Sequence, residues 1–327
     1  MASPLVDVRD DRRPVAWTCL AFGVGFHSDF DMPGLASTSV EGAPRSSRIL
    51  CAGRHEAEAW AEPGGELVFE DTFDETVCTL TACFDGSFRA YSSAHGDFLV
   101  SDDGREIRCF VAEDAEPWKW RRFLIGQVLP LAALLGGLET IHASAVATES
   151  GALVIAGRSH VGKTSLAVHL VAGGGVLLAD DVVALERTGD DALAHPALGL
   201  VGIRHAECAV MGPERLAELG SVVTTNDKEQ LVAVARVGAA QPVRSVYLPE
   251  RNGSDRGVEF VPCDDPRFLL SATYNNVLGR PDRLATMLDA YAAVSRSAGV
   301  HRVLVPSDVG ARELAEAIAD HHAASRW

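Results

Sequence analysis

The sequence predicts an α/β protein in which a nucleotide-binding domain follows a smaller, mostly β N-terminal domain. Three observations lead to this fold class. Short strand-like segments separated by turn signals run from about residue 16 to residue 112, and a helical pattern of apolar residues begins at residue 117. Beyond that helix, strands and helices alternate around a glycine-rich motif. Because 327 residues suffice for two modest domains, we expect the domains at residues 1–116 and 117–327.

The N-terminal part has the pattern of a series of short strands. Turn signals such as Asp85-Gly86 and Asp103-Gly104 separate several of them. The expected strands cover residues 17–26, 48–53, 66–73, 76–86, 87–94, 97–102 and 106–113. No residue in this part indicates a particular chemistry, so the role of the N-terminal domain stays open.

The second part begins with a helix expected over residues 116–137. Apolar residues recur there at spacings of three and four, and Gly136-Gly137 ends the pattern. The expected elements that follow are strands at 142–147 and 152–157, a helix at 164–172, strands at 176–180 and 242–250, a helix at 281–297, a strand at 300–306 and a helix at 308–325. Such alternation is typical of an α/β domain.

The composition argues against several partners and locations. The net charge is −16 and no cluster of Lys and Arg is present, so we expect no nucleic-acid partner. No apolar run reaches the roughly 18–20 residues that a membrane helix needs, and no apolar signal region follows the charged N-terminus. The seven Cys form no C-x-x-C pair and are expected to be free thiols in a reducing compartment. These features predict a cytoplasmic protein without a membrane partner.

Lysine is rare in this chain, which has 26 Arg and only 3 Lys. We interpret this bias as the effect of a GC-rich coding sequence that replaces Lys by Arg wherever either residue serves. The remaining Lys119, Lys163 and Lys228 are then candidates for positions that need a compact ammonium group.

Residues 157–164 have the form G-x-x-x-x-G-K-T, which binds phosphate groups when it joins a strand to a helix. Backbone N–H groups of residues 158–162 would surround the phosphates. Lys163 would contact the β- and γ-phosphates, and the Thr164 hydroxyl would bind Mg²⁺. The motif therefore predicts ATP and Mg²⁺ as cofactors. The expected nucleotide-binding residues are Gly157, Arg158, Ser159, His160, Val161, Gly162, Lys163, Thr164 and Ser165.

Three further polar residues flank the motif. Asp180 and Asp181 end an apolar strand seventeen residues beyond Lys163, and His142 lies fifteen residues before Gly157. One of the two carboxylates can bind Mg²⁺, directly or through water, while its neighbour faces the phosphoryl acceptor. As alternatives, Asp181 only caps a turn, and His142 is a hydrogen-bonded core residue of an apolar strand.

His142, the Gly-Lys-Thr motif and "LLADD" together resemble the HPr kinase/phosphorylase family, whose P-loop domain has a fold related to PEP carboxykinase. The resemblance covers about residues 123–185 well and the N-terminal part hardly at all. It implies that Lys163 and Thr164 are the loop lysine and the Mg²⁺-binding hydroxyl residue. It also implies that Asp180 is the metal-side carboxylate. Asp181 would then be the acid/base for the acceptor serine, with His142 as its partner.

The sequence also departs from that family. His160 stands where relatives often have a small residue. The Arg-rich C-terminal signature of the phosphorylase activity is matched only weakly, by residues 278–283. The β-rich N-terminal part is more similar to HPr-kinase-like proteins of peptide natural-product clusters, some of which phosphorylate a precursor peptide on serine. Lys228 falls where such relatives often have a basic residue. The candidates for further phosphate contacts are Lys228, Arg204, Arg267 and Arg280.

The sequence thus predicts an ATP- and Mg²⁺-dependent kinase that phosphorylates a hydroxyl, above all serine, of a peptide, small protein or small metabolite. Two alternatives are a kinase restricted to small molecules and a non-catalytic regulator that uses nucleotide binding as a switch. Asp181 and His142 favour a kinase, because a switch needs no acceptor base. The acceptor, the nucleotide preference and the occurrence of phosphorolysis stay open, and a homo-oligomer is compatible with the sequence.

Overall fold

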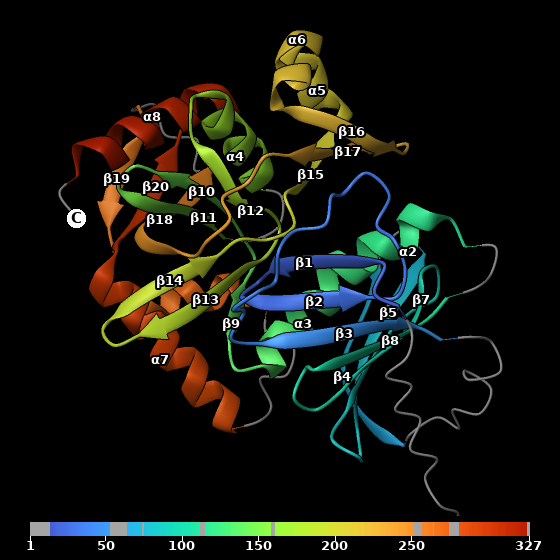
Figure 1. The fold of residues 1–327 in the computed structure, drawn as a ribbon. Helices are drawn as coiled ribbons and strands as arrows, with labels where there is room; N and C mark the ends of the chain where they lie inside the picture. Colours follow the sequence, from blue (N-terminus) through green and yellow to red (C-terminus); the bar gives the residue numbers. More distant parts are fainter. Residues whose placement is uncertain are drawn as a thin grey trace, which may run out of the picture.

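The computed structural model describes residues 14–52, 64–73, 75–111, 115–157, 161–251, 257–263, 265–274 and 281–325. Over these residues the chain is a mixed α/β protein with an eight-stranded, a nine-stranded and a three-stranded sheet (Figure 1). Within the described ranges, no helix combines the length and the apolar character needed to span a membrane. All seven Cys are free thiols.

The N-terminal sheet confirms the predicted β-rich region. Its strands are β1 (Trp17–Ala21), β2 (Val24–Ser28), β3 (Ser46–Cys51), β4 (Gly65–Phe73), β5 (Thr76–Cys83), β6 (Phe88–Ser92), β7 (Gly96–Val100) and β8 (Glu106–Phe110). They are arranged in the order β1-β2-β3-β8-β7-β6-β5-β4, and β3 is parallel to both of its neighbours. The segment expected as one strand at 17–26 is instead a hairpin. Its turn residues Phe22 and Gly23 have φ values of 51° and 73°, the positive values that two-residue hairpin turns favour.

The tip of this hairpin packs against the later part of the chain. The Phe22 N–H donates a hydrogen bond to the Pro196 carbonyl over 2.7 Å. A Cβ atom at Gly23 would lie only 2.8 Å from the Leu138 side chain, so the close approach favours glycine. One apolar core cluster contains residues on both sides of residue 116. The proposed division of the chain at that residue therefore stays a prediction.

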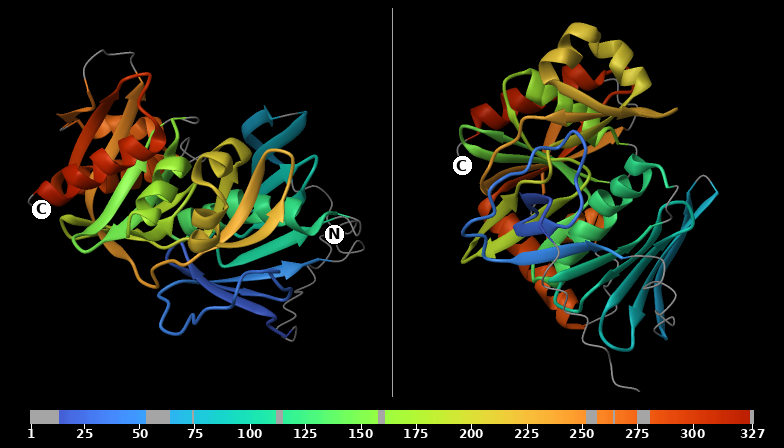
Figure 2. Two further views of the ribbon diagram at one scale, coloured as in Figure 1. Left: turned by 90° about the horizontal axis from the view of Figure 1, so that it is seen from above. Right: turned by 45° about the vertical axis from the view of Figure 1, so that its right-hand side comes forward.

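The expected helix at 116–137 occurs but contains a π-helical turn. It consists of α2 (Pro117–Phe123), the π-helix η1 (Leu124–Val128) and α3 (Leu129–Leu135). Pro130 has no N–H to donate to the carbonyl of Gly126, four residues earlier, and such freed groups accompany wide turns. The Tyr274 hydroxyl donates to that carbonyl over 2.5 Å, so the Gly126 carbonyl is paired. The helix lies between the N-terminal sheet and the larger sheet (Figure 2).

The nine-stranded sheet holds most of the elements predicted for the second part. Its strands are β9 (Glu139–Ile141), β10 (Ala143–Thr148), β11 (Gly151–Ala156), β12 (Val176–Ala179), β13 (Val183–Thr188), β14 (Asp191–His195), β18 (Gln241–Arg251), β19 (Glu259–Pro262) and β20 (Gly299–Val305). The long strand β18 is central, because it runs parallel to both β11 and β20. The helices of this part are α4 (Lys163–Ala172), α7 (Pro281–Ser297) and α8 (Ala311–Ala324). Of these, α8 packs against α4, and α7 packs against β13 and β14.

A small third sheet with two short helices was not predicted. It consists of β15 (Leu200–Arg204), β16 (Gly220–Thr225) and β17 (Glu229–Val234), with α5 (His205–Met211) and α6 (Pro213–Leu219) beside it. A separate 3₁₀ helix, η2 (Pro266–Ala272), lies later in the chain. Val168 of α4 shares an apolar cluster with Val201 and Val232 of this sheet. The cluster anchors the small sheet next to the helix that follows the glycine-rich motif.

Candidate active site

The glycine-rich segment joins β11 to α4, as the sequence predicts. Gly157 follows the strand with a φ of 132°, and Gly162 precedes the helix with a φ of 90°. A Cβ atom at either position would meet no close neighbour, so the backbone conformation is what favours glycine there. Three predicted nucleotide-binding residues, Arg158, Ser159 and His160, lie outside the described residues. The first turn of α4, with Thr164 and Ser165, presents backbone N–H groups at a helix N-terminus, where anions bind.

Lys163 is the first residue of α4 and is only 6% exposed. Its ammonium group donates a hydrogen bond to the Gly157 carbonyl over 3.0 Å, so it lies across the two ends of the glycine-rich segment. Burial lowers the pKa of Lys163 below its usual value, although Asp181 and Asp180 oppose that shift. The site therefore holds a desolvated cation beside two carboxylates.

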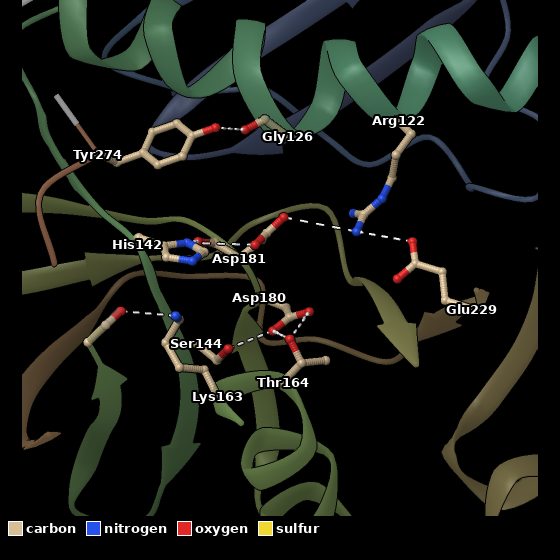
Figure 3. Close-up of polar contacts among 11 residues, drawn as sticks. Arg122, Gly126, His142, Ser144, Lys163, Thr164, Asp180, Asp181, Glu229 and Tyr274 are labelled. Carbon is tan, nitrogen blue, oxygen red and sulfur yellow. Dashed lines mark hydrogen bonds and ion pairs between the residues drawn. The ribbon is translucent and has the colours of Figure 1, made fainter. Parts of the chain in front are cut away.

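Asp180 follows β12 and accepts hydrogen bonds from two hydroxyl groups (Figure 3). Ser144 Oγ lies 2.6 Å from Asp180 Oδ1, and Thr164 Oγ1 lies 3.0 and 3.2 Å from the two carboxylate oxygens. Burial, and then the charge of Asp181, raise the pKa of Asp180 to about 6. Thr164 and Asp180, which the sequence predicts as metal ligands, thus lie together and offer the oxygen donors that Mg²⁺ prefers.

Asp181 is the central residue of a tight turn. The Val182 N–H donates to the Asp180 carbonyl over 2.9 Å, an i→i+2 hydrogen bond, and Asp181 has a φ of 71°. A γ-turn with positive φ is rare and strained, and such strain is concentrated at functional sites. The turn points the two neighbouring carboxylates in different directions (Figure 3). The Asp181 side chain is 42% exposed, so it is accessible to an acceptor.

His142 lies between β9 and β10 and contacts Asp181 in two ways. Its Nδ1 atom is 2.8 Å from the Asp181 carbonyl oxygen and 3.7 Å from Asp181 Oδ1. Because a carbonyl only accepts, Nδ1 carries the proton, and the lone pair of the neutral ring is on Nε2. Burial, and then the charge of Lys163, lower the pKa of His142. The ring is therefore a neutral imidazole near pH 7, held beside the Asp181 carboxylate.

Four residues of this site were not identified from the sequence, namely Ser144, Arg122, Glu229 and Tyr274 (Figure 3). Ser144 is one of them, and its polarity within the apolar strand 142–147 was the only available signal. Arg122 lies on α2, with Nη2 3.3 Å from Glu229 and 4.0 Å from the Asp181 carboxylate. Tyr274 packs its ring against His142, with centroids 6.3 Å apart. The last three come from segments far apart in the sequence, so no local pattern could have grouped Arg122, Glu229 and Tyr274.

The additional phosphate-contact candidates are dispersed. Lys228 precedes β17 and lines a cavity together with Arg122. Arg204 is the exposed last residue of β15. Arg267 lies in η2 and pairs with Asp265 at 2.7 Å, with both side chains exposed. Arg280 lies outside the described residues.

No protein-family model matches this chain, and no curated protein matches it. Among solved structures, it is similar to the Hpr(Ser) kinase/phosphatase from Coxiella burnetii over 57% of this chain and 96% of that chain, with 15% sequence identity and a TM-score of 0.32. At that TM-score and identity, the similarity assigns neither a fold nor an activity to this chain.

We expect Asp180→Asn to stabilise the protein in the absence of metal. The pKa of Asp180 is about 6 in the folded state, above its usual 3.8. As the pH rises, Asp180 therefore loses its proton later in the folded state than in the unfolded chain. The free energy of unfolding therefore falls as the pH rises from about 4 to 6, and this loss persists at pH 7.5. Asn resembles the neutral carboxyl group and avoids the loss. Melting temperatures of both proteins in EDTA at pH 5.0 and 7.5 measure the effect.

The increase in melting temperature that Asp180→Asn causes in EDTA should be larger at pH 7.5 than at pH 5.0. Added Mg²⁺ should raise the melting temperature of the wild type at pH 7.5 and leave the variant unchanged. Asp289→Asn is the control, since Asp289 is an exposed residue of α7 that pairs with Arg187. An advantage of equal size at both pH values would contradict the buried, proton-binding state of Asp180.

Proposed function

We propose that this protein is an ATP- and Mg²⁺-dependent kinase that transfers the γ-phosphoryl group to a hydroxyl, above all serine, of a peptide, small protein or small metabolite. Its arrangement would be that of the HPr-kinase-like enzymes, which the sequence motifs resemble. One observation carries the proposal. The turn after β12 directs Asp180 to the Thr164 hydroxyl and Asp181 to His142, so adjacent carboxylates serve opposite sides of the site.

The residues on the nucleotide side fit ATP and a divalent cation. The N-terminus of α4 and the Lys163 ammonium group are suited to phosphate oxygens. Thr164 and Asp180 would hold Mg²⁺, which supplies neutralisation of the charge that develops on the phosphates. Ser144 holds the Asp180 carboxylate in place by donating to Oδ1.

The residues on the acceptor side fit the removal of a proton. The Asp181 carboxylate would accept the proton of the acceptor hydroxyl. At the same time the hydroxyl oxygen would bond to the γ-phosphorus, and ADP would leave with the bridging oxygen. The neutral His142 ring, with Nδ1 3.7 Å from Asp181 Oδ1, would orient that carboxylate. Arg122, 4.0 Å from Asp181, would keep the carboxylate directed towards the acceptor side.

Phosphoryl transfer distinguishes this proposal from a nucleotide-dependent switch. The purified protein is incubated with labelled ATP and Mg²⁺, with and without pools of peptides, small proteins and hydroxyl-bearing metabolites. We expect label on an acceptor hydroxyl, located by mass spectrometry, and slow release of free phosphate when no acceptor is present. Reactions in EDTA serve as the control. Fast phosphate release that is independent of any acceptor would favour an ATPase switch instead.

A further inference from the structure

All three lysines of the chain lie at or near the candidate active site. Lys163 begins α4, while Lys119 and Lys228 line one cavity. Arginine outnumbers lysine by 26 to 3 in this sequence, so a retained lysine marks a position at which a compact ammonium group is useful. The placement of Lys119 and Lys228 on the same cavity therefore points to an anionic ligand.

The cavity has a volume of about 770 Å³, within the range of small-molecule sites. It is bounded by the N-terminal sheet, by the helix 117–135 and by the segment that joins β16 to β17. Most of its wall is apolar and includes Phe69, Leu80, Trp118, Phe123 and Leu131. The occupant must therefore carry an apolar body as well as a charge.

The cavity and the acceptor side of the active site share two residues, although neither Asp181 nor His142 lines the cavity. Arg122 lines it and also reaches Asp181 and Glu229. Tyr274, which packs against His142, is a second shared residue.

The charges on the cavity wall are positive on balance, in a protein of net charge −16. Lys119, Lys228 and Arg122 outnumber Glu116 and Asp227. Lys119 pairs with Glu116 at 3.3 Å, with both side chains exposed, and Arg122 pairs with Glu229 at 3.3 Å. His95 also lines the wall, and burial, and then the charge of Lys119, lower its pKa. The ring therefore stays neutral near pH 7 and does not add to the cationic surface.

We propose that this cavity holds the phosphoryl acceptor, and that the acceptor is a hydroxyl-bearing organic anion with an apolar body. Lys119 and Lys228 would bind its carboxylate or other acidic group, while Arg122 and Tyr274 mark the end at which its hydroxyl meets Asp181. The acid can be a small molecule or an acidic residue beside a serine in a peptide. The proposal rests on the kinase function proposed above and gives the N-terminal sheet a role, as a wall of the acceptor site.

The binding test uses two fluorescent dyes and the full-length protein without ATP. Anilinonaphthalene sulfonate is an apolar anion, and phenylnaphthylamine is its neutral counterpart. Lys119→Met combined with Lys228→Met should weaken binding of the sulfonate about 2- to 30-fold, from the ordinary strength of two exposed ion pairs, and leave the neutral dye unaffected. Ala94→Trp, at an exposed lining position in the turn between β6 and β7, should weaken both dyes by filling the mouth of the cavity.

Two matched controls accompany these variants. Arg105→Met combined with Arg312→Met changes the net charge equally at exposed positions away from the cavity. Phe84→Ala removes an exposed apolar side chain that does not line the cavity. Neither control should change dye binding. Equal loss of both dyes in the lysine variant, or no effect of Ala94→Trp, would overturn the anion site.

The acceptor role is tested in the transfer reaction. Apolar hydroxy acids and short serine peptides with an acidic residue are compared with their amide counterparts, which separates the two sources of the anion. The lysine variant should raise the KM for the acidic acceptor several-fold and leave the KM for ATP unchanged. An unchanged acceptor KM would overturn the role of the cavity while leaving the kinase intact. If no acceptor is phosphorylated but the dyes bind as expected, the proposed kinase function is refuted and only an anion-binding cavity remains.

Discussion

Asp181→Asn should retain Mg-ATP binding and lose phosphoryl transfer by about 10²–10⁴-fold, the usual cost of removing a general base. Asparagine is the appropriate substitution, because Asp181 has a φ of 71° and Asn tolerates the left-handed region better than most other non-glycine residues. The backbone turn is thereby kept, and only the ability to take a proton is lost. Transfer rates and nucleotide affinities, measured against one acceptor, separate the two effects.

His142 and Asp180 provide the comparisons for that variant. His142→Ala should act in the same direction as Asp181→Asn but more weakly, and the two changes together should cost less than the product of their separate effects. Asp180→Asn should instead weaken Mg²⁺ binding, so that transfer needs more metal and excess metal partly restores it. Asp289→Asn should leave transfer unchanged. Full transfer activity in Asp181→Asn would refute the proposed mechanism, whatever the other variants did.

Lys163→Ala should lower the affinity for ATP about 10- to 150-fold, the equivalent of the 1.5–3 kcal/mol that a charged hydrogen bond typically contributes. Lys163→Arg should fail as well. The ammonium group lies within 3.0 Å of the Gly157 carbonyl and the residue is only 6% exposed, so a larger planar guanidinium group does not fit. Isothermal titration with ATP and Mg²⁺ measures the affinities.

The fold should survive Lys163→Ala, because burial already opposes the charged state of this lysine, as its lowered pKa indicates. Circular dichroism and melting temperature check this point. Arg105→Ala, at an exposed residue of the N-terminal part, controls for the change in net charge. Wild-type ATP affinity in Lys163→Arg would contradict the assignment of the glycine-rich segment as a phosphate site.

Much of the secondary structure was predictable, because it depends on local patterns. Strand alternation in the N-terminal part and the strand–loop–helix sequence around Gly157 and Gly162 both occur as predicted. The interruption at Pro130 also follows a local rule, since proline removes one helical hydrogen bond. The small third sheet was missed, because its short strands and helices have weak periodicity and are anchored by packing against α4.

The residues of the candidate site fall into the same two groups, those predicted from local sequence patterns and those that only the packing brings together. The sequence by itself determined the glycine-rich segment, Lys163, Thr164 and the paired carboxylates, since these depend on residue type and close spacing. Only the tertiary structure decided that Ser144 contacts Asp180, that Arg122 reaches Asp181 and that Lys119 and Lys228 line one cavity. Such contacts depend on strand register and on the packing of one sheet against a helix. The free energy of that packing is spread over many buried side chains, and no short segment encodes it.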